Sequence, residues 1–212
     1  MVRRPAAAVA TADKVIRVLS IDGGGIRGII PARVLTYLEL MSGKPISDLC
    51  HFIAGTSTGG IIASALAAPD PGNPGRAAHR AQDVLDLYVQ RGSRMFRRDL
   101  WDRVTNPYGI NDQLYDHEAL VAELKLKFKD TLLSQARVEL LVTSYDIWNR
   151  RPFYFKSWRA QPSYGTVVNG FRKVRGRKDE EVDLRDFPLW AVARATSAAP
   201  TYFEPAQVTS VG

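Results

Sequence analysis

The stretch Ile53-Ala-Gly-Thr-Ser-Thr-Gly-Gly60 decides the fold, because it joins the end of a strand to the start of a helix. The apolar residues 52–54 are typical of a buried strand, and residues 61–67 of a helix. Between them, Gly55-Thr-Ser-Thr-Gly59 fits G-x-S-x-G, the strained strand-to-helix turn that exposes a nucleophilic serine. A short pattern of this kind also occurs in ordinary loops with a capping serine, but the flanking strand and helix favour the nucleophile.

A second glycine-rich turn, Ile21-Asp-Gly-Gly-Gly-Ile-Arg-Gly28, ends the preceding strand pattern of residues 15–21. A helical spacing of apolar residues follows over 28–41, so the order is strand, helix, strand, helix. This order predicts an α/β fold with a mainly parallel sheet and helices on both faces. Both turns then lie at the carboxyl ends of neighbouring strands, where a shared site is expected.

The remaining patterns predict one catalytic domain over residues 15–212, preceded by a disordered, basic and Ala-rich tail over residues 1–14. The second strand is placed at about Leu49 to Ala54, and the proline- and glycine-rich residues 69–75 are expected to be a plain loop. Further strands are predicted at 138–145 and 151–158, and further helices at 77–90, 115–128 and 184–199.

The spacing Gly23-x-Gly25-x-x-Gly28 also fits a dinucleotide-binding loop, which is a competing interpretation. That interpretation needs an acidic residue at the end of the second strand, where this chain has the serine turn instead. The nearby Asp48 precedes the strand, and Asp22 is unfavourable beside a pyrophosphate. The backbone amides of Gly23, Gly24 and Gly25 are therefore predicted to form an oxyanion hole.

Five neighbouring residues are predicted to support this site. Asp22 is expected to brace the glycine loop through backbone hydrogen bonds, and Arg27 to add positive charge, although a surface ion pair would also explain Arg27. Gly28, Gly55 and Gly59 are the glycines of the two turns, and at the flanks of the serine a Cβ atom would clash in so tight a turn.

No histidine occupies the position of a catalytic base. In α/β hydrolases with a Ser-Asp-His triad the histidine comes last, and here none follows His117. His51 and His79 come earlier still, so a triad is not supported and a carboxylate acting directly on the serine stays open. The three histidines and the single Cys50 show no zinc spacing, and we expect no metal and no cofactor.

The net charge of +7 is concentrated in two basic runs, at residues 91–103 and 171–178. Each run is either a solvated loop or a surface that attracts anionic lipid headgroups. No nucleic-acid-binding pattern accompanies them, so we expect no nucleic-acid partner. The chain has no apolar run long enough for a membrane span and no convincing signal peptide, so a cytoplasmic or peripheral membrane location is expected. The sequence does not indicate the oligomeric state.

Three segments resemble the patatin-like phospholipases: Ser20–Pro31, Gly55–Gly60 and Ala195–Phe203. The first two are similar to plant-type patatins in particular. The resemblance implies an α/β serine acyl hydrolase that acts, without metal, on phospholipids and related acyl lipids at a membrane or micelle. It implies Ser57 as the nucleophile of a Ser–Asp dyad and the amides of Gly23 to Gly25 as the oxyanion hole.

The chain departs from the family at the aspartate of the dyad. That residue normally stands in Asp-Gly-Gly or Asp-Gly-Ala, and the only Asp-Gly here is Asp22-Gly23. Asp183 and Asp186 precede the third segment, which is the wrong side of it. We therefore expect a catalytic domain that is incomplete at its C-terminus, with the aspartate beyond residue 212 and no activity in the chain as given. The alternative is a non-catalytic relative that binds lipid or a partner.

Overall fold

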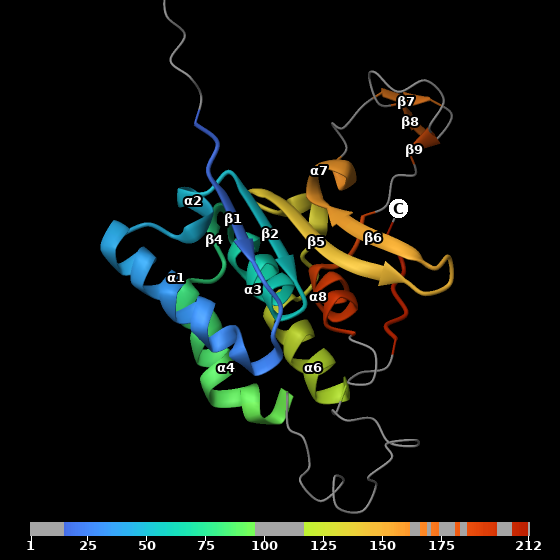
Figure 1. The fold of residues 1–212 in the computed structure, drawn as a ribbon. Helices are drawn as coiled ribbons and strands as arrows, with labels where there is room; N and C mark the ends of the chain where they lie inside the picture. Colours follow the sequence, from blue (N-terminus) through green and yellow to red (C-terminus); the bar gives the residue numbers. More distant parts are fainter. Residues whose placement is uncertain are drawn as a thin grey trace, which may run out of the picture.

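The computed structural model describes residues 15–95, 117–161, 166–168, 171–173, 181–182, 186–198 and 205–211. Its centre is a four-stranded sheet in the order β1-β2-β5-β6 (Figure 1). These strands are Val18–Ile21, Phe52–Thr56, Glu139–Asp146 and Arg151–Lys156. The pairs β1–β2 and β2–β5 are parallel, whereas β5–β6 is antiparallel. The predicted α/β architecture with a mainly parallel sheet is thereby confirmed.

Side chains alternate across this sheet, and one face carries the core. Ile21, Ile53, Leu140, Val142 and Phe155 are all buried on this face. Against it packs α3, Thr58–Ala67, all ten residues of which are buried. A helix that is apolar all round is stable only when neighbours surround it, and α3 contacts the strands β1, β2 and β5 and the helix α8.

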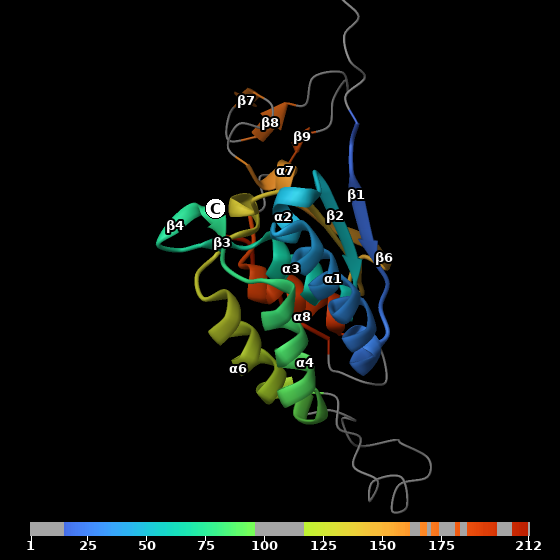
Figure 2. The same cartoon turned by 90° about the vertical axis from the view of Figure 1, so that its left-hand side faces the viewer.

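The longer helices lie on the same side of the sheet as α3 (Figure 2). They are α1, Ile29–Ser42; α4, Ala81–Met95; α6, His117–Phe128; and α8, Leu189–Ser197. The sequence predicts helices on both faces, but in the described segments none of these helices covers the second face. None of them is both long and apolar enough to cross a bilayer.

Three segments correct the predicted boundaries. The second strand starts only at Phe52, because Ile46–Leu49 forms the short helix α2. The proline- and glycine-rich segment pairs as a small hairpin of β3, Pro69–Asp70, and β4, Asn73–Ala77, and is therefore not a plain loop. The last helix starts only at Leu189, because Pro188 disfavours a helical backbone at the residue before it and is itself extended at ψ 134°.

The other short elements are η1, Gly25–Gly28; η2, Leu133–Gln135; α7, Ser157–Ala160; and the three-stranded sheet of β7, Thr166–Val168, β8, Phe171–Lys173, and β9, Glu181–Val182. Several predictions fall outside the described residues: the tail over 1–14, most of the basic run over 91–103, Asp183, and the end of the third resembling segment.

Candidate active site

Ser57 occupies a sharp turn between β2 and α3. Its backbone has φ 54° and ψ −124°, a conformation that residues other than glycine rarely adopt. Holding a serine there costs about 1–3 kcal/mol, so the surrounding structure must enforce it. The Ser57 carbonyl accepts the first bond of α3, from the Ile61 amide at 3.0 Å. The turn thus has the strained backbone that the G-x-S-x-G pattern predicts.

The glycines on either side of Ser57 permit contacts between backbones that a side chain would prevent. A Cβ atom on Gly59 would lie under 3.0 Å from the carbonyl oxygens of Ile21 and Asp22. A Cβ atom on Gly55 would meet the Gly59 carbonyl at a similarly forbidden distance. The end of β1, the end of β2 and the start of α3 are therefore in direct backbone contact, which is the physical reason for both glycines.

The third resembling segment supports the same turn from α8. The Ser57 amide donates a hydrogen bond of 2.8 Å to Oγ1 of Thr196. A Cβ atom on Gly60 would lie 2.7 Å from Cγ2 of Thr196 and 2.9 Å from Cγ1 of Val142. Thr196 lies in the resembling segment 195–203, but no sequence pattern indicates a role for it. Its hydroxyl fixes the backbone of the serine turn.

A second side chain whose role no sequence pattern indicates is Tyr88 on α4, which is buried beneath the turn. Its hydroxyl shares a hydrogen bond with Oγ1 of Thr58 and also donates to the Thr58 carbonyl at 3.3 Å. Burial raises the pKa of Tyr88 well above its ordinary value, so the phenol stays neutral. A Cβ atom on Gly28 would lie 3.0 Å from the Tyr88 ring and closer still to Oγ1 of Thr58, which explains the predicted glycine.

The glycine-rich loop after β1 lies against Ser57. A Cβ atom on Gly23 would be 3.0 Å from Cβ of Ser57 and 3.1 Å from the Thr56 carbonyl oxygen. Gly25 has φ 57°, and the Arg27 amide closes the tight turn on the Gly24 carbonyl at 3.1 Å. The loop and the first turn of α3 thus bring backbone amides beside the serine. The oxyanion role of Gly23, Gly24 and Gly25 remains a prediction.

Asp22 and Arg27 are both exposed at the rim of this loop. They line a groove of about 460 Å³ that runs beside β1 and α1. Among the described residues, nothing donates a hydrogen bond to the Asp22 carboxylate, so the expected bracing of the loop by Asp22 is not observed there. Arg27 contributes its backbone amide to the turn, and its side chain provides positive charge at the groove.

Within the described residues, no histidine or carboxylate is hydrogen-bonded to Ser57. Nδ1 of His51 accepts the Arg17 amide at 3.0 Å, at the opposite end of β2. Nε2 of His79 lies 3.1 Å from the Lys127 carbonyl oxygen. The Asp186 carboxylate accepts amides from Ser134 at 3.0 Å and Phe187 at 2.8 Å, which is a structural role. The side chain of His117 is outside the part of the chain that the structure describes.

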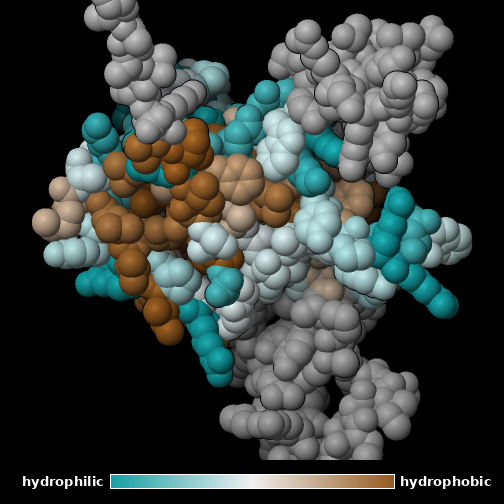
Figure 3. Space-filling view, turned by 45° about the horizontal axis from the view of Figure 1, so that its top comes forward, coloured by the Kyte–Doolittle hydropathy of each residue, from teal (hydrophilic) through white to brown (hydrophobic). Residues whose placement is uncertain are grey.

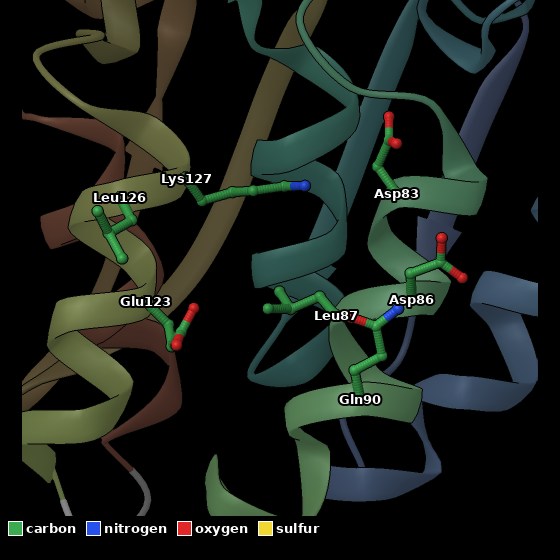
Figure 4. Close-up of a pocket in the computed structure, with 7 residues that line it drawn as sticks. All are labelled: Asp83, Asp86, Leu87, Gln90, Glu123, Leu126 and Lys127. Atoms are coloured by element: carbon green, nitrogen blue, oxygen red, sulfur yellow. The ribbon is translucent and has the colours of Figure 1, made fainter.

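Another groove, of about 360 Å³, lies between α4 and α6 and is remote from these groups (Figure 4). Asp83, Asp86 and Glu123 line it, and Lys127 extends across it towards α4. Burial lowers the pKa of Lys127, and the two aspartates oppose this change. Neither the serine turn nor the glycine loop borders this groove, so the candidate active site is at the carboxyl ends of β1 and β2.

Comparison with known proteins identifies the family. The sequence model of a family described as patatin-like phospholipase matches residues 19–211. The chain belongs to the patatin-like phospholipase family. Among curated relatives, it is 32% identical over 200 residues to Patatin-17 of Solanum cardiophyllum, and 31% identical over 206 residues to Patatin-like protein 2 of Arabidopsis thaliana. It is 30% identical over 203 residues to "Probable inactive patatin-3-Kuras 1" of Solanum tuberosum.

The chain spans less than half the length of these patatin relatives. The alignments include 91%, 91% and 92% of this chain, but only 44%, 44% and 47% of the respective relatives. The matched region of the patatin-like family includes the glycine loop, the serine turn and the Thr196 segment. More than half of each relative has no counterpart in residues 1–212.

Proposed function

We propose that this chain carries the nucleophile and the oxyanion loop of a serine acyl-ester hydrolase that acts on membrane or micellar lipids. The observation that carries the proposal is the backbone of Ser57, at φ 54° and ψ −124° between a parallel strand and a buried helix. This strained turn places the side chain of Ser57 beside the glycine-rich loop, since a Cβ atom on Gly23 would be 3.0 Å from Cβ of Ser57. Membership of the patatin-like phospholipase family supports the lipid substrate.

In the proposed reaction, a base takes the proton from Oγ of Ser57 as that oxygen attacks the ester carbonyl. The carbonyl oxygen becomes negative, and backbone amides of Gly23 to Gly25 stabilise it, at about 3–4 kcal/mol for each well-placed donor. The ester bond to the lipid alcohol then breaks, and the alcohol leaves with the proton. Water, deprotonated by the same base, hydrolyses the acyl–serine ester and restores the free hydroxyl.

The proposed base is an aspartate in an Asp-Gly-Gly or Asp-Gly-Ala motif beyond residue 212. Two observations support this location. The described Asp186 is bound to Ser134 and Phe187, and the Asp22 carboxylate is in the glycine loop and makes no bond to Ser57. Without a base, we expect only the residual rate that the turn and the oxyanion loop provide, by analogy about 10³–10⁴-fold over water.

The test uses an extended form that includes the Asp-Gly motif. Ser57→Ala is expected to abolish ester hydrolysis and labelling by a fluorophosphonate, because it removes the atom that forms the covalent bond. Ser64→Ala is the control: this serine lies within α3, the helix that follows Ser57, and its hydroxyl is buried. Labelling that survives Ser57→Ala would exclude Ser57 as the nucleophile.

A second variant, Gly25→Ala, tests the oxyanion loop. The side chain is strained at φ 57° and displaces the amides, so kcat should fall more than KM rises, because the oxyanion exists only in the transition state. An unchanged kcat with a raised KM would contradict the assignment.

The second candidate function is a non-catalytic, lipid- or partner-binding protein. It is favoured by the lack of a base bonded to Ser57 among the described residues, and by the similarity to a relative whose own name contains the words "Probable inactive". The same extended form separates the two functions: fluorophosphonate labelling and turnover of a short-chain ester support the hydrolase, and binding of lipid without either supports the non-catalytic protein.

A further inference from the structure

The turn between β5 and β6 protrudes from the carboxyl end of the sheet. Thr143 on β5 lies level with Thr56, the residue before Ser57, and the two threonine hydroxyl groups share a hydrogen bond of 2.8 Å. Beyond Thr143, β5 continues to Asp146, which adds about 10 Å in an extended strand. The turn of residues 147–150 therefore stands beyond the level of the serine turn, at the right-hand side of Figure 1.

Two apolar and two basic side chains are exposed at this turn. Trp148 is 91% exposed, more than any other large hydrophobic residue that the structure describes, and Ile147 is 60% exposed. Arg150 and Arg151 follow and are also exposed. Figure 3 shows hydrophilic side chains protruding at the right-hand side of the molecule, over the β5–β6 hairpin. We call residues 147–151 the β5–β6 tip. An indole ring left in water forfeits the free energy of its burial, so its exposure here indicates a partner.

The turn is held in one conformation by Asp146. Its carboxylate accepts hydrogen bonds from the amides of Trp148 and Asn149, at 3.1 Å each, and from Nδ2 of Asn149 at 2.6 Å. The bonds from Asn149 lower the pKa of the Asp146 carboxyl, so it stays ionised and keeps these partners. Arg150 has φ 51°, and the chain returns as β6 from Arg151. The tip is therefore presented on a fixed hairpin.

The two arginines give the tip positive charge that a partner can reach. The Asp146 side chain is only 23% exposed, and its Oδ2 lies 4.0 Å from Nε of Arg151, whose side chain stays 65% exposed. Within the described part of the chain, no carboxylate forms an ion pair with Arg150. Guanidinium groups bind phosphate and carboxylate oxygens through charge-assisted hydrogen bonds. The tip is thus complementary to an anionic surface.

We propose that the β5–β6 tip binds the surface of a bilayer that contains anionic phospholipids. Trp148 and Ile147 enter the headgroup region, where an indole is favoured because one part of the ring is apolar and the other donates a hydrogen bond. Arg150 and Arg151 contact the anionic headgroups. The choice of a lipid partner rests on the proposed function, whereas the place of contact rests on the tip itself.

The small size of the tip favours a bilayer over a second protein. A stable protein–protein interface buries roughly 800 Å² on each partner, from about 20–30 residues a side. The tip has only residues 147–151. Binding to a bilayer does not need a large complementary surface, because insertion of apolar side chains and attraction to anionic lipids both contribute.

Binding through the tip brings the candidate active site to the membrane. The tip and Ser57 follow the carboxyl ends of neighbouring parallel strands, and the tip extends further by about 10 Å along the strand. Amphipathic segments penetrate the interface by about 5–10 Å. A tip inserted to this depth places the serine turn near the level of the headgroups, and the acyl esters of a phospholipid lie just beneath them.

The first test measures flotation of residues 1–212 with phosphatidylcholine vesicles, made with and without phosphatidylserine. The wild type is expected to bind more tightly when phosphatidylserine is present. Trp148→Ala should weaken binding about 10-fold or more, because the apolar area that enters the interface is lost. Arg150→Gln combined with Arg151→Gln should weaken binding to the anionic vesicles about 30-fold, at about fivefold for each arginine, and should leave binding to phosphatidylcholine alone unchanged.

Matched variants remove the same kinds of group elsewhere. Tyr37→Ala removes a ring that is 60% exposed on α1. Arg76→Gln combined with Arg80→Gln removes two exposed arginines that follow the far end of α3, where salt screens them from a bilayer at the tip. Both controls should bind like the wild type. Unfolding midpoints should be unchanged in all of these variants, because the substituted side chains are exposed.

Tryptophan fluorescence locates the inserted side chain. Acyl chains that carry bromine quench an indole that enters the bilayer. Trp148→Phe keeps an aromatic ring and should retain most of the binding. It should nevertheless lose the quenched part of the fluorescence, since the indole of Trp148 is the group that is quenched.

An extended form that includes the Asp-Gly motif separates this inference from the proposed hydrolase. Substitutions at the tip should lower hydrolysis of vesicle phospholipid in proportion to binding. They should leave fluorophosphonate labelling of Ser57 and hydrolysis of a soluble short-chain ester unchanged. Vesicle binding through the tip without any labelling of the wild type would contradict the hydrolase and leave the membrane contact supported.

Three outcomes would overturn the membrane contact. The first is equal vesicle binding by the wild type and by the folded Trp148→Ala and double arginine variants. The second is undiminished quenching in Trp148→Phe, which would show that Trp148 stays outside the bilayer. The third is self-association of the wild type that Trp148→Ala abolishes, without binding to anionic vesicles, which would identify a second copy of the chain as the partner.

Discussion

The two sides of the serine turn differ in how completely they are packed. On one side, α3 is buried along its whole length, and the hydroxyl groups of Thr196 and Tyr88 bond the turn. On the other, α1 buries only Ala32, Leu35 and Glu39, and among the described strands β1 pairs with β2 alone. The position of the nucleophile therefore depends mainly on contacts with α3, α4 and α8.

The largest loss of stability is expected from a variant that breaks the backbone contact between α3 and the end of β1. Gly59→Ala is expected to cost about 4 kcal/mol or more, because the new Cβ atom would overlap carbonyl oxygens that cannot move independently of β1. Gly72→Ala is the control, since its nearest neighbour would be Oδ1 of Asp70 at 3.5 Å. Denaturant unfolding measures both, and similar midpoints for the two variants would contradict the close contact.

Truncating one side chain on each side of the serine turn tests whether the two sides differ in packing. Ile62→Ala on α3 should destabilise the fold by about 2–4 kcal/mol, because it leaves a cavity in a fully packed region. Val34→Ala on α1 should change stability by less than about 0.5 kcal/mol in residues 1–212, since Val34 is largely exposed. Equal losses in thermal or denaturant unfolding would mean that the two sides are packed alike.

The bond between Thr196 and the serine turn predicts a smaller effect. Thr196→Val keeps the shape but leaves the Ser57 amide without its acceptor, at a cost of about 1–3 kcal/mol. In an extended active form, kcat should fall as well, because the strained backbone of Ser57 loses a constraint. Thr196→Ser keeps the hydroxyl and should retain most of the stability and the rate. A Thr196→Val variant with normal unfolding and normal kcat would exclude this role.

The smallest effect concerns pH and the buried Tyr88. Because the folded pKa of Tyr88 lies above the unfolded value of about 10, the folded protein keeps a proton that the unfolded chain releases. Stability from this group is complete below pH 10 and is lost as the pH rises further. Between pH 9 and pH 11, the wild type should lose about 1.4 kcal/mol more than Tyr88→Phe. Parallel pH profiles from urea titrations would contradict this.

Much of the fold was predictable because its strongest patterns are local. The alternation of apolar strands and helices gave β1, α1, β2 and α3, and glycine spacing located the two turns. The errors occur where tertiary contacts override the pattern. The proline- and glycine-rich residues 69–77 pair as a hairpin because the Ala78 amide and the Ala68 carbonyl close its base, at 2.9 Å. In the described residues the longer helices lie on one face of the sheet, and the hydrophobic pattern of a helix does not specify which face it covers.

The sequence by itself determined the family, the order of the elements and the identity of the strained serine turn. It did so because the requirement for Gly55 is local, arising from contact with the backbone of Gly59 and Gly60, and such local requirements leave a readable pattern. The requirement for Gly59 comes instead from the carbonyl oxygens of Ile21 and Asp22 at the end of the neighbouring strand. Only the tertiary structure decided which distant side chains hold the turn. Thr196 is 139 residues from Ser57 and Tyr88 is 30 from Thr58, and a hydrogen bond across such separations depends on how the helices pack. It also decided that β1 lies at one end of the described sheet, since strand order is set by which strands pair and not by their order in the chain.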